Sequence, residues 1–241
     1  MAHRGLHGGD APENTLAAVE AAVEAGYAVE IDLQFTADGG LIILHDPTLE
    51  RTTGGEGPVA AQTLDTLRAV PIRGTDETLS SLDDALALVS GRAPLFLDLK
   101  APRTIERKAA MTAAVQRALG RYGGATAAMT FDPDMLGLLR RALPDTPLGI
   151  LSGRETPHTS MINRFGLDAM LHTPRTKPDF VAYFAQSLPN PAVRFHRRKR
   201  PVLAWTVRTE VERQRLAPHV DQIIFEGFSP TDRMSADPSS R

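Results

Sequence analysis

The sequence predicts an α/β fold, a closed (β/α)8 TIM barrel with a β-hairpin extension after its second strand. Strand and helix patterns alternate along the chain, which is typical of a parallel sheet covered by helices. Nine segments have strand character, and eight of them suffice to close a barrel. A hairpin accounts for the ninth, because the dipeptide Asp38-Gly39 tolerates the positive φ that tight turns require.

Hydrophobic periodicity defines each element in order. Residues 13–25 are apolar at helical spacing and stop at Gly26, residues 27–35 alternate with period two, and residues 41–45 form an apolar run. The expected strands are a first one that ends in His3-Arg4-Gly5, then 27–35, 41–45, 94–100, 125–131, 147–151, 168–172, 201–207 and 221–225. The expected helices are 13–25, 81–90, 104–121, 133–142, 178–187 and 209–217.

The hairpin has a consequence for the site. Strand 27–35 is expected to rise above the barrel rim and strand 41–45 to return, so that His45 lies near the barrel mouth. Because no internal boundary interrupts the alternation, residues 1–230 are predicted to form one barrel domain. Residues 231–241 have turn and disorder composition and are predicted to be a disordered tail.

Composition excludes several classes of protein. The chain has 241 residues, is 42% hydrophobic and 23% charged, and carries a formal net charge of -2, so nucleic acid is not an expected partner. It has no cysteine, which excludes disulfides, thiolate metal sites and a cysteine nucleophile. No apolar run is long enough for membrane insertion, and the N-terminus lacks the apolar stretch of a signal peptide. A cytoplasmic protein is therefore predicted.

Polar residues gather at the strand ends where barrel enzymes place their active sites. The first strand ends in His3-Arg4, the second carries Glu30 and Asp32, the hairpin returns His45-Asp46, and strand 94–100 carries Asp98 and Lys100. Each residue alone has an ordinary explanation, such as capping or solvation. Together, three carboxylates at one barrel mouth would repel unless a cation lay among them, and oxygen ligands suit Mg²⁺ or Ca²⁺.

The same residues carry a resemblance to a known family. His-Arg-Gly (3–5), Pro-Glu-Asn-Thr (12–15), Glu-x-Asp (30–32), Asp-Gly (38–39) and His-Asp (45–46) occur in the order typical of glycerophosphodiester phosphodiesterases. The chain resembles that family densely over 2–57 and more thinly to about residue 230, with "LFLDLK" and "VLAWTV" similar to later family strands.

The resemblance implies an enzyme that hydrolyses small glycerophosphodiesters to sn-glycerol 3-phosphate and an alcohol, with one divalent cation. It implies His3 and His45 as general acid and base, in an order that the sequence leaves open. The implied metal ligands are Glu30, Asp32 and Asp98, and the implied phosphate-binding residues are Arg4 and Lys100. His172 and Trp205 are predicted to bind substrate from their positions in strands expected to line the pocket. For His172 and Trp205 a purely structural role stays open.

Several positions depart from the family pattern. Asp98 is one methylene shorter than the usual Glu, Arg208 replaces a common Asn, and Phe225-Glu226 replaces Thr-Asp. The late strands help to shape the substrate end of such a site. The alcohol moiety, the choice between Mg²⁺ and Ca²⁺, and the oligomeric state therefore stay open.

Two other functions stay open as alternatives. One is a phospholipase D-like or C-like enzyme on lysolipids or lipids, for which the basic segment 196–200 would attract anionic headgroups rather than be a solvated helix end. The other is a non-catalytic barrel that binds phosphorylated metabolites. The intact histidine pair and carboxylates argue against a loss of activity.

Overall fold

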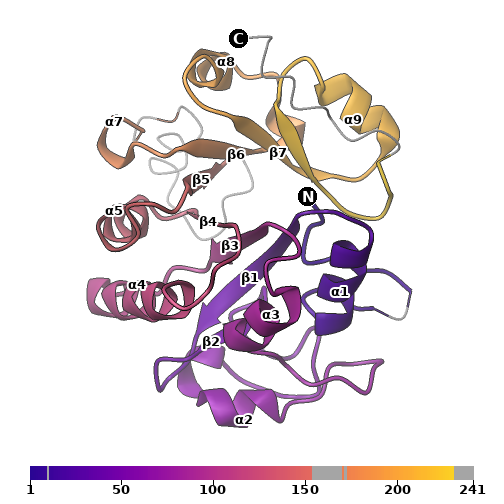
Figure 1. Ribbon diagram of the computed structural model, residues 1–241, viewed down its shortest axis with the longest axis vertical. Coiled ribbons are helices and arrows are strands. Elements are labelled where there is room, and N and C mark those ends of the chain that lie inside the picture. The colour runs from indigo at the N-terminus through magenta and orange to yellow at the C-terminus, as the bar shows by residue number, and fades with distance from the viewer. Residues whose placement is uncertain (10, 154–169, 171–172, 231–241) are drawn as a thin grey trace.

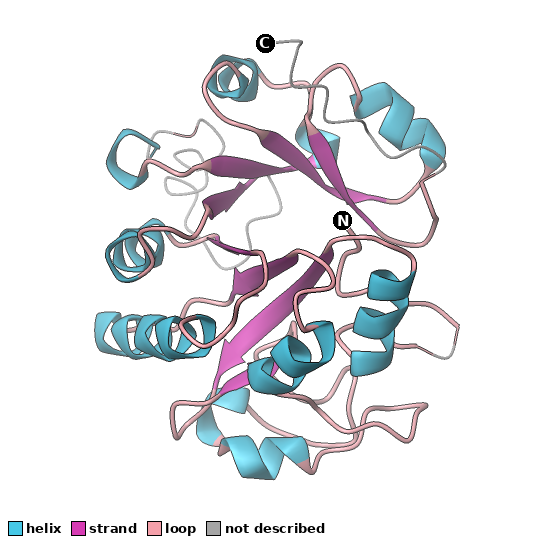
Figure 2. Ribbon diagram, in the orientation of Figure 1, coloured by secondary structure: helices cyan, strands magenta, loops and turns pink. Residues whose placement is uncertain are grey.

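One curled sheet organises the molecule. The structure, a computed structural model, describes residues 1–9, 11–153, 170 and 173–230. Eight strands follow the order β2-β1-β3-β4-β5-β6-β7-β8, with β2 antiparallel to β1 and the other neighbours parallel. The strands are β1 (Val29–Phe35), β2 (Leu41–Ile43), β3 (Leu95–Leu99), β4 (Thr126–Thr130), β5 (Leu148–Ser152), β6 (Phe180–Phe184), β7 (Val202–Val207) and β8 (Gln222–Phe225). Helices lie along the outside of the curled sheet (Figure 2).

The N-terminal segment joins the two ends of the parallel sheet. Ala2 forms parallel bridges to Val29 of β1 and to Phe225 of β8, and the N-terminus lies between these strands in Figure 1. The first strand is no longer than this bridge because Arg4 and Gly5 have φ values of 54° and 79°, which turn the chain. The predicted (β/α)8 barrel with a β-hairpin is thereby confirmed.

The helices begin where the sequence provides caps. They are α1 (Leu16–Glu24), α2 (Leu64–Arg68), α3 (Leu82–Val89), α4 (Ile105–Leu119), α5 (Pro133–Ala142), α7 (Thr173–Thr176), α8 (Pro191–Arg197) and α9 (Glu210–Leu216). Before each of them except α7 stands a Ser, Thr, Asp or Asn whose side chain accepts a backbone hydrogen bond. Among the described residues, no helix combines the length and apolar character of a membrane span.

The predicted helix over 178–187 is wrong. Residues Phe180–Phe184 form β6 between β5 and β7, and a short 3-10 helix, η2 (Ala185–Ser187), follows. The run Phe-Val-Ala-Tyr-Phe is apolar on both faces, so periodicity could not separate a buried strand from a buried helix. The predicted strand over 168–172 lies outside the described residues except for Met170, which is in a turn.

The long connection between β2 and α3 has a small core of its own. It holds α2 and a 3-10 helix, η1 (Val59–Ala61), neither of which the sequence analysis expected. Its buried apolar residues are Ile42, Leu44, Leu49, Val59, Leu67, Ile72 and Leu79. Since Leu44 is part of this cluster, the chain next to His45 is anchored by packing.

Candidate active site

Strand alternation directs four polar side chains into the barrel. In β1 and β3 the odd-numbered residues pack into the apolar core that includes the helices. The even-numbered residues therefore face the interior, and these include Glu30, Asp32 and Asp98, with Lys100 directly after β3. Asp32 and Asp98 stand opposite each other in the strand register.

Glu30, Asp32 and Asp98 form a compact carboxylate group. Each offers an oxygen within 4.8 Å of the others, and their side chains are buried. The Lys100 ammonium lies 2.6 Å from an oxygen of Asp32 and 2.6 Å from an oxygen of Asp98. The other Asp98 oxygen, Oδ1, is buried and has no hydrogen-bond partner within the part of the chain that the structure describes. A donor set of oxygens alone, with one oxygen unpaired, fits a divalent cation such as Mg²⁺ or Ca²⁺.

The three carboxylates differ in how well nearby positive charges compensate them. Burial raises the pKa of Glu30 well above its usual range, and the charges of Asp32 and Asp98 raise it further. Burial also raises the pKa of Asp98, against the attraction of Lys100. Burial would raise the pKa of Asp32 too, but Lys100 and then Arg4 hold it well below its usual range. The nearby positive charges therefore compensate Asp32 better than Glu30.

Arg4 links the N-terminal turn to the carboxylates. Its backbone N–H donates to Glu30 at 2.8 Å, and its guanidinium donates to Glu13 at 2.8 Å. The Arg4 Nε lies 3.2 Å from Asp32, close enough for an ion pair but without hydrogen-bond geometry. Asn14 donates to Asp32 at 2.8 Å and so holds that carboxylate from a second side.

His45 is held by a chain of charged groups. Its Nδ1 lies 2.6 Å from Asp46, whose carboxylate accepts from Arg51 at 2.5 Å. Arg51 in turn donates to Glu13 at 2.6 Å. The backbone carbonyl of His45 accepts a hydrogen bond from Gln34 of β1 at 2.8 Å. We call Glu13, Asp46 and Arg51 the charged bridge, because they connect the β2 end to the N-terminal loop.

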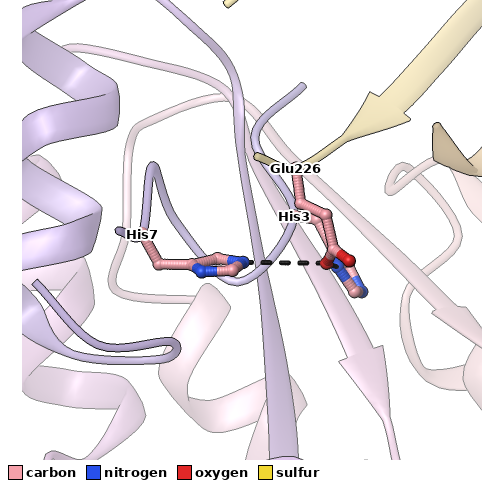
Figure 3. A group of neighbouring side chains, drawn as sticks. All are labelled: His3, His7 and Glu226. Atoms are coloured by element: carbon pink, nitrogen blue, oxygen red, sulfur yellow. Dashed lines mark hydrogen bonds and ion pairs between the residues drawn. The ribbon is translucent and has the colours of Figure 1, made fainter. Parts of the chain in front are cut away.

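His3 has a carboxylate partner that the sequence analysis missed. Glu226, directly after β8, lies beside His3 (Figure 3), with one oxygen 2.6 Å from His3 Nδ1. Its other oxygen lies 2.6 Å from Arg208. Burial lowers the pKa of His3, opposed by the hydrogen bond to Glu226. The same hydrogen bond holds the pKa of Glu226 well below its usual range. The sequence signal was present, since Glu226 and Arg208 are both departures from the family pattern.

The remaining predicted residues have different outcomes. Trp205 of β7 is half-buried, packs against Phe131 and Phe184, and donates from Nε1 to the carbonyl of Ala182 at 3.1 Å. These contacts are structural, and they leave the predicted substrate contact untested. His172 lies outside the described residues.

The basic segment 196–200 is partly structural. Arg197 pairs with Asp221 at 3.3 Å and donates to the carbonyls of Pro218 and Val220. It thereby ties α8 to the turn before β8.

Comparisons with known proteins agree on one family. A sequence model of the glycerophosphoryl diester phosphodiesterase family matches residues 3–226. Glycerophosphodiester phosphodiesterase 1 of Bos taurus is 51% identical over 111 residues, which cover 42% of this chain and 33% of that protein. A glycerophosphodiester phosphodiesterase of Bacillus altitudinis is 29% identical over 165 residues, which cover 63% of this chain and 65% of that protein.

A solved structure has the same fold. The phosphodiesterase of Oleispira antarctica, in complex with the product sn-glycerol-3-phosphate, superposes with a TM-score of 0.78 at 24% identity. The superposition covers 93% of this chain and 91% of that one. The matched segment spans only about a third of the bovine relative's length, so likeness to that protein extends to one part of it.

Proposed function

Because the chain belongs to the glycerophosphoryl diester phosphodiesterase family, we propose that it hydrolyses glycerophosphodiesters to sn-glycerol 3-phosphate and an alcohol. The product named in this proposal is the one bound in the Oleispira antarctica structure, whose fold this chain shares. The observation that carries the proposal is the buried carboxylate group beside Lys100 and Arg4, with one unpaired oxygen on Asp98.

Glu30, Asp32 and Asp98 would hold one divalent cation. When bound, such a cation offsets the charge of a phosphodiester and that of the developing transition state. The positive side chains of Arg4 and Lys100 both lie beside Asp32, so they would bind and orient the phosphate oxygens. Asn14 keeps Asp32 in place through its hydrogen bond.

His3 and His45 would divide the proton transfers. His3 directly precedes Arg4, whose backbone N–H donates to Glu30. His45 directly follows Leu44, whose N–H donates to the carbonyl of Asp32, so both histidines lie near the carboxylate group. A neutral His3 that donates its Nδ1 proton to Glu226 leaves Nε2 unprotonated, which suits the general base. His45, hydrogen-bonded to Asp46, would then protonate the leaving alkoxide. Because one ring must be neutral and the other charged, we expect a bell-shaped pH dependence of kcat/KM, and a flat profile from about pH 5 to about pH 9 would contradict it.

The first experiment measures release of sn-glycerol 3-phosphate from glycerophosphocholine and glycerophosphoethanolamine. The wild type is assayed with Mg²⁺, with Ca²⁺ or with EDTA, beside His45→Ala and the control His219→Ala, whose histidine precedes β8. We expect metal-dependent release, unaltered in His219→Ala and reduced roughly 10²-fold to 10⁴-fold in His45→Ala. Release that persists in EDTA would contradict the cation role, and no release by folded, metal-loaded protein would contradict the activity.

A further inference from the structure

A second group of potential metal ligands lies beside His3. His3, His7 and Glu226 each offer one ligand atom, and these atoms all lie within 4.8 Å of one another. In Figure 3 the His7 ring faces the carboxylate of Glu226 from the loop that follows the first strand. The His7 Nε2 is 3.7 Å from Glu226, which is too long for a hydrogen bond.

His7 is the informative member of this group. Its Nε2 is buried and has no hydrogen-bond partner among the described residues, although a buried imidazole nitrogen is ordinarily satisfied. The proposed hydrolysis gives His7 no task. A buried nitrogen that makes no hydrogen bond to any described residue, faces a carboxylate at ion-pair distance and lies near a second imidazole is in the arrangement expected of a metal ligand.

The donor atoms distinguish this group from the carboxylate group. Two imidazole nitrogens and one carboxylate oxygen suit Zn²⁺ and similar transition-metal ions, whereas oxygens alone suit Mg²⁺ and Ca²⁺. Arg208 binds Oε1 of Glu226 and leaves Oε2 directed at the histidines. Arg208 would thus orient the ligating carboxylate through its second oxygen, as outer partners of metal ligands do.

We propose that His3, His7 and Glu226 form a second cation site, which takes Zn²⁺ and switches the enzyme off. A metal ion on His3 Nδ1 displaces the proton shared with Glu226, and the neutral imidazole then carries its proton on Nε2. A protonated Nε2 cannot accept a proton from the attacking water. The inhibition rests on the proposed role of His3 in hydrolysis, whereas the binding of Zn²⁺ does not.

Binding is tested first, without reference to activity. EDTA-treated and dialysed protein is saturated with Mg²⁺ and titrated with Zn²⁺ in a calorimeter, as wild type, His7→Ala and the matched control His219→Ala. We expect one Zn²⁺ per chain in wild type and control, and an affinity more than about tenfold weaker in His7→Ala. Equal Zn²⁺ affinity in wild type and His7→Ala would overturn the site.

Inhibition is tested next, with Mg²⁺ saturating and Zn²⁺ increasing. His7→Ala is expected to hydrolyse glycerophosphocholine at the wild-type rate and to need more than about tenfold more Zn²⁺ for half inhibition. An equal Zn²⁺ concentration for half inhibition of wild type and His7→Ala would overturn the switch, since Zn²⁺ would then act at the carboxylate group. If the protein hydrolyses no diester, the calorimetry still shows whether Zn²⁺ binds at His7. A failure of the proposed activity can therefore be distinguished from a failure of the proposed cation site.

Discussion

Glu226 illustrates how one side chain can set the tautomer and orientation of a histidine for which we propose a catalytic role. It joins His3 to Arg208 across the end of β8, so its two oxygens are both occupied. A carboxylate on Nδ1 fixes the orientation and the tautomer of an imidazole. Under the proposed mechanism, Glu226 is therefore a positioning residue for His3.

Replacing Glu226 separates positioning from substrate binding. In Glu226→Gln we expect kcat to fall roughly tenfold to 100-fold with little change in KM, because the His3 ring loses its anionic partner. Glu226→Asp, which keeps the carboxylate, should recover part of the rate. Steady-state kinetics on glycerophosphocholine measure both variants.

The control for this prediction is Glu210→Gln in the first turn of α9, where Glu210 pairs with Arg213. Its kcat should equal that of the wild type. The ¹⁵N chemical shifts of the His3 ring report the tautomer directly. An unchanged tautomer in Glu226→Gln would contradict the positioning role.

At the scale of elements, the charged bridge holds the end of β2 against the N-terminal loop. Burial raises the pKa of Glu13, but Arg51 and Arg4 reverse this effect, so the net pKa of Glu13 lies below its usual value. A carboxylate whose pKa is lowered by folding stabilises the protein above its unfolded pKa and loses that contribution as the pH falls.

Glu13→Gln tests the bridge through its pH dependence. We expect the variant to be about 1 kcal/mol less stable than wild type at pH 7, since a charged hydrogen bond at a partly exposed site is lost. The difference should narrow as the pH falls below about 4, where the unfolded carboxyl takes up its proton. Urea unfolding at several pH values measures this, with exposed Glu24→Gln on α1 as the control. A pH-independent difference would contradict the electrostatic account.

The contact between β5 and β6 depends on a glycine. A Cβ at Gly149 would lie 2.2 Å from the ring of Phe180 on the neighbouring strand. Gly149→Ala should therefore lower the free energy of unfolding by about 1–3 kcal/mol, because the ring cannot move without displacing packed neighbours. The matched variant Gly137→Ala lies on α5, where the new Cβ would meet no described atom within 4 Å beyond its chain neighbours and its own helix backbone, and it should raise the free energy of unfolding by about 0.5–1 kcal/mol. The urea concentrations at the midpoint of unfolding compare the two variants. A Gly149→Ala variant as stable as the wild type would contradict the packing argument.

At the scale of the molecule, we propose that residues 1–230 fold as one unit. Ala2 connects β1 to β8, and the apolar residue Phe228 packs against the main core. A chain that ends at residue 230 should keep the melting temperature and specific activity of the full chain. Calorimetry and the diester assay test this, and a clear fall in melting temperature would show that residues 231–241 contribute to folding.

Most elements could be predicted because their signals are local. Thr15, Ser81 and Thr104 each precede a periodic apolar segment and cap the helix that follows. The dipeptide Asp38-Gly39 is by itself sufficient to indicate a hairpin turn. β6 could not be predicted, because a strand buried on both faces has no period of its own. The small core between β2 and α3 could not be predicted either, because its residues are scattered from residue 42 to residue 79 and follow no regular spacing.

The sequence by itself determined the barrel, the hairpin and the motif residues, because strand alternation and turn chemistry act over a few neighbouring positions. It also placed Glu30 and Asp32 on one face of their strand and Asp98 on the same face as Lys100, all at the barrel mouth. Only the tertiary structure decided the partners that are distant in the sequence, such as Glu226 for His3 and Glu13 for Arg51. These pairs join residues 223 and 38 positions apart, so no local pattern records them. His3 meets Glu226 only when the closed sheet brings the two ends of the chain together. Arg51 meets Glu13 only when the loop after β2 folds against the N-terminal loop.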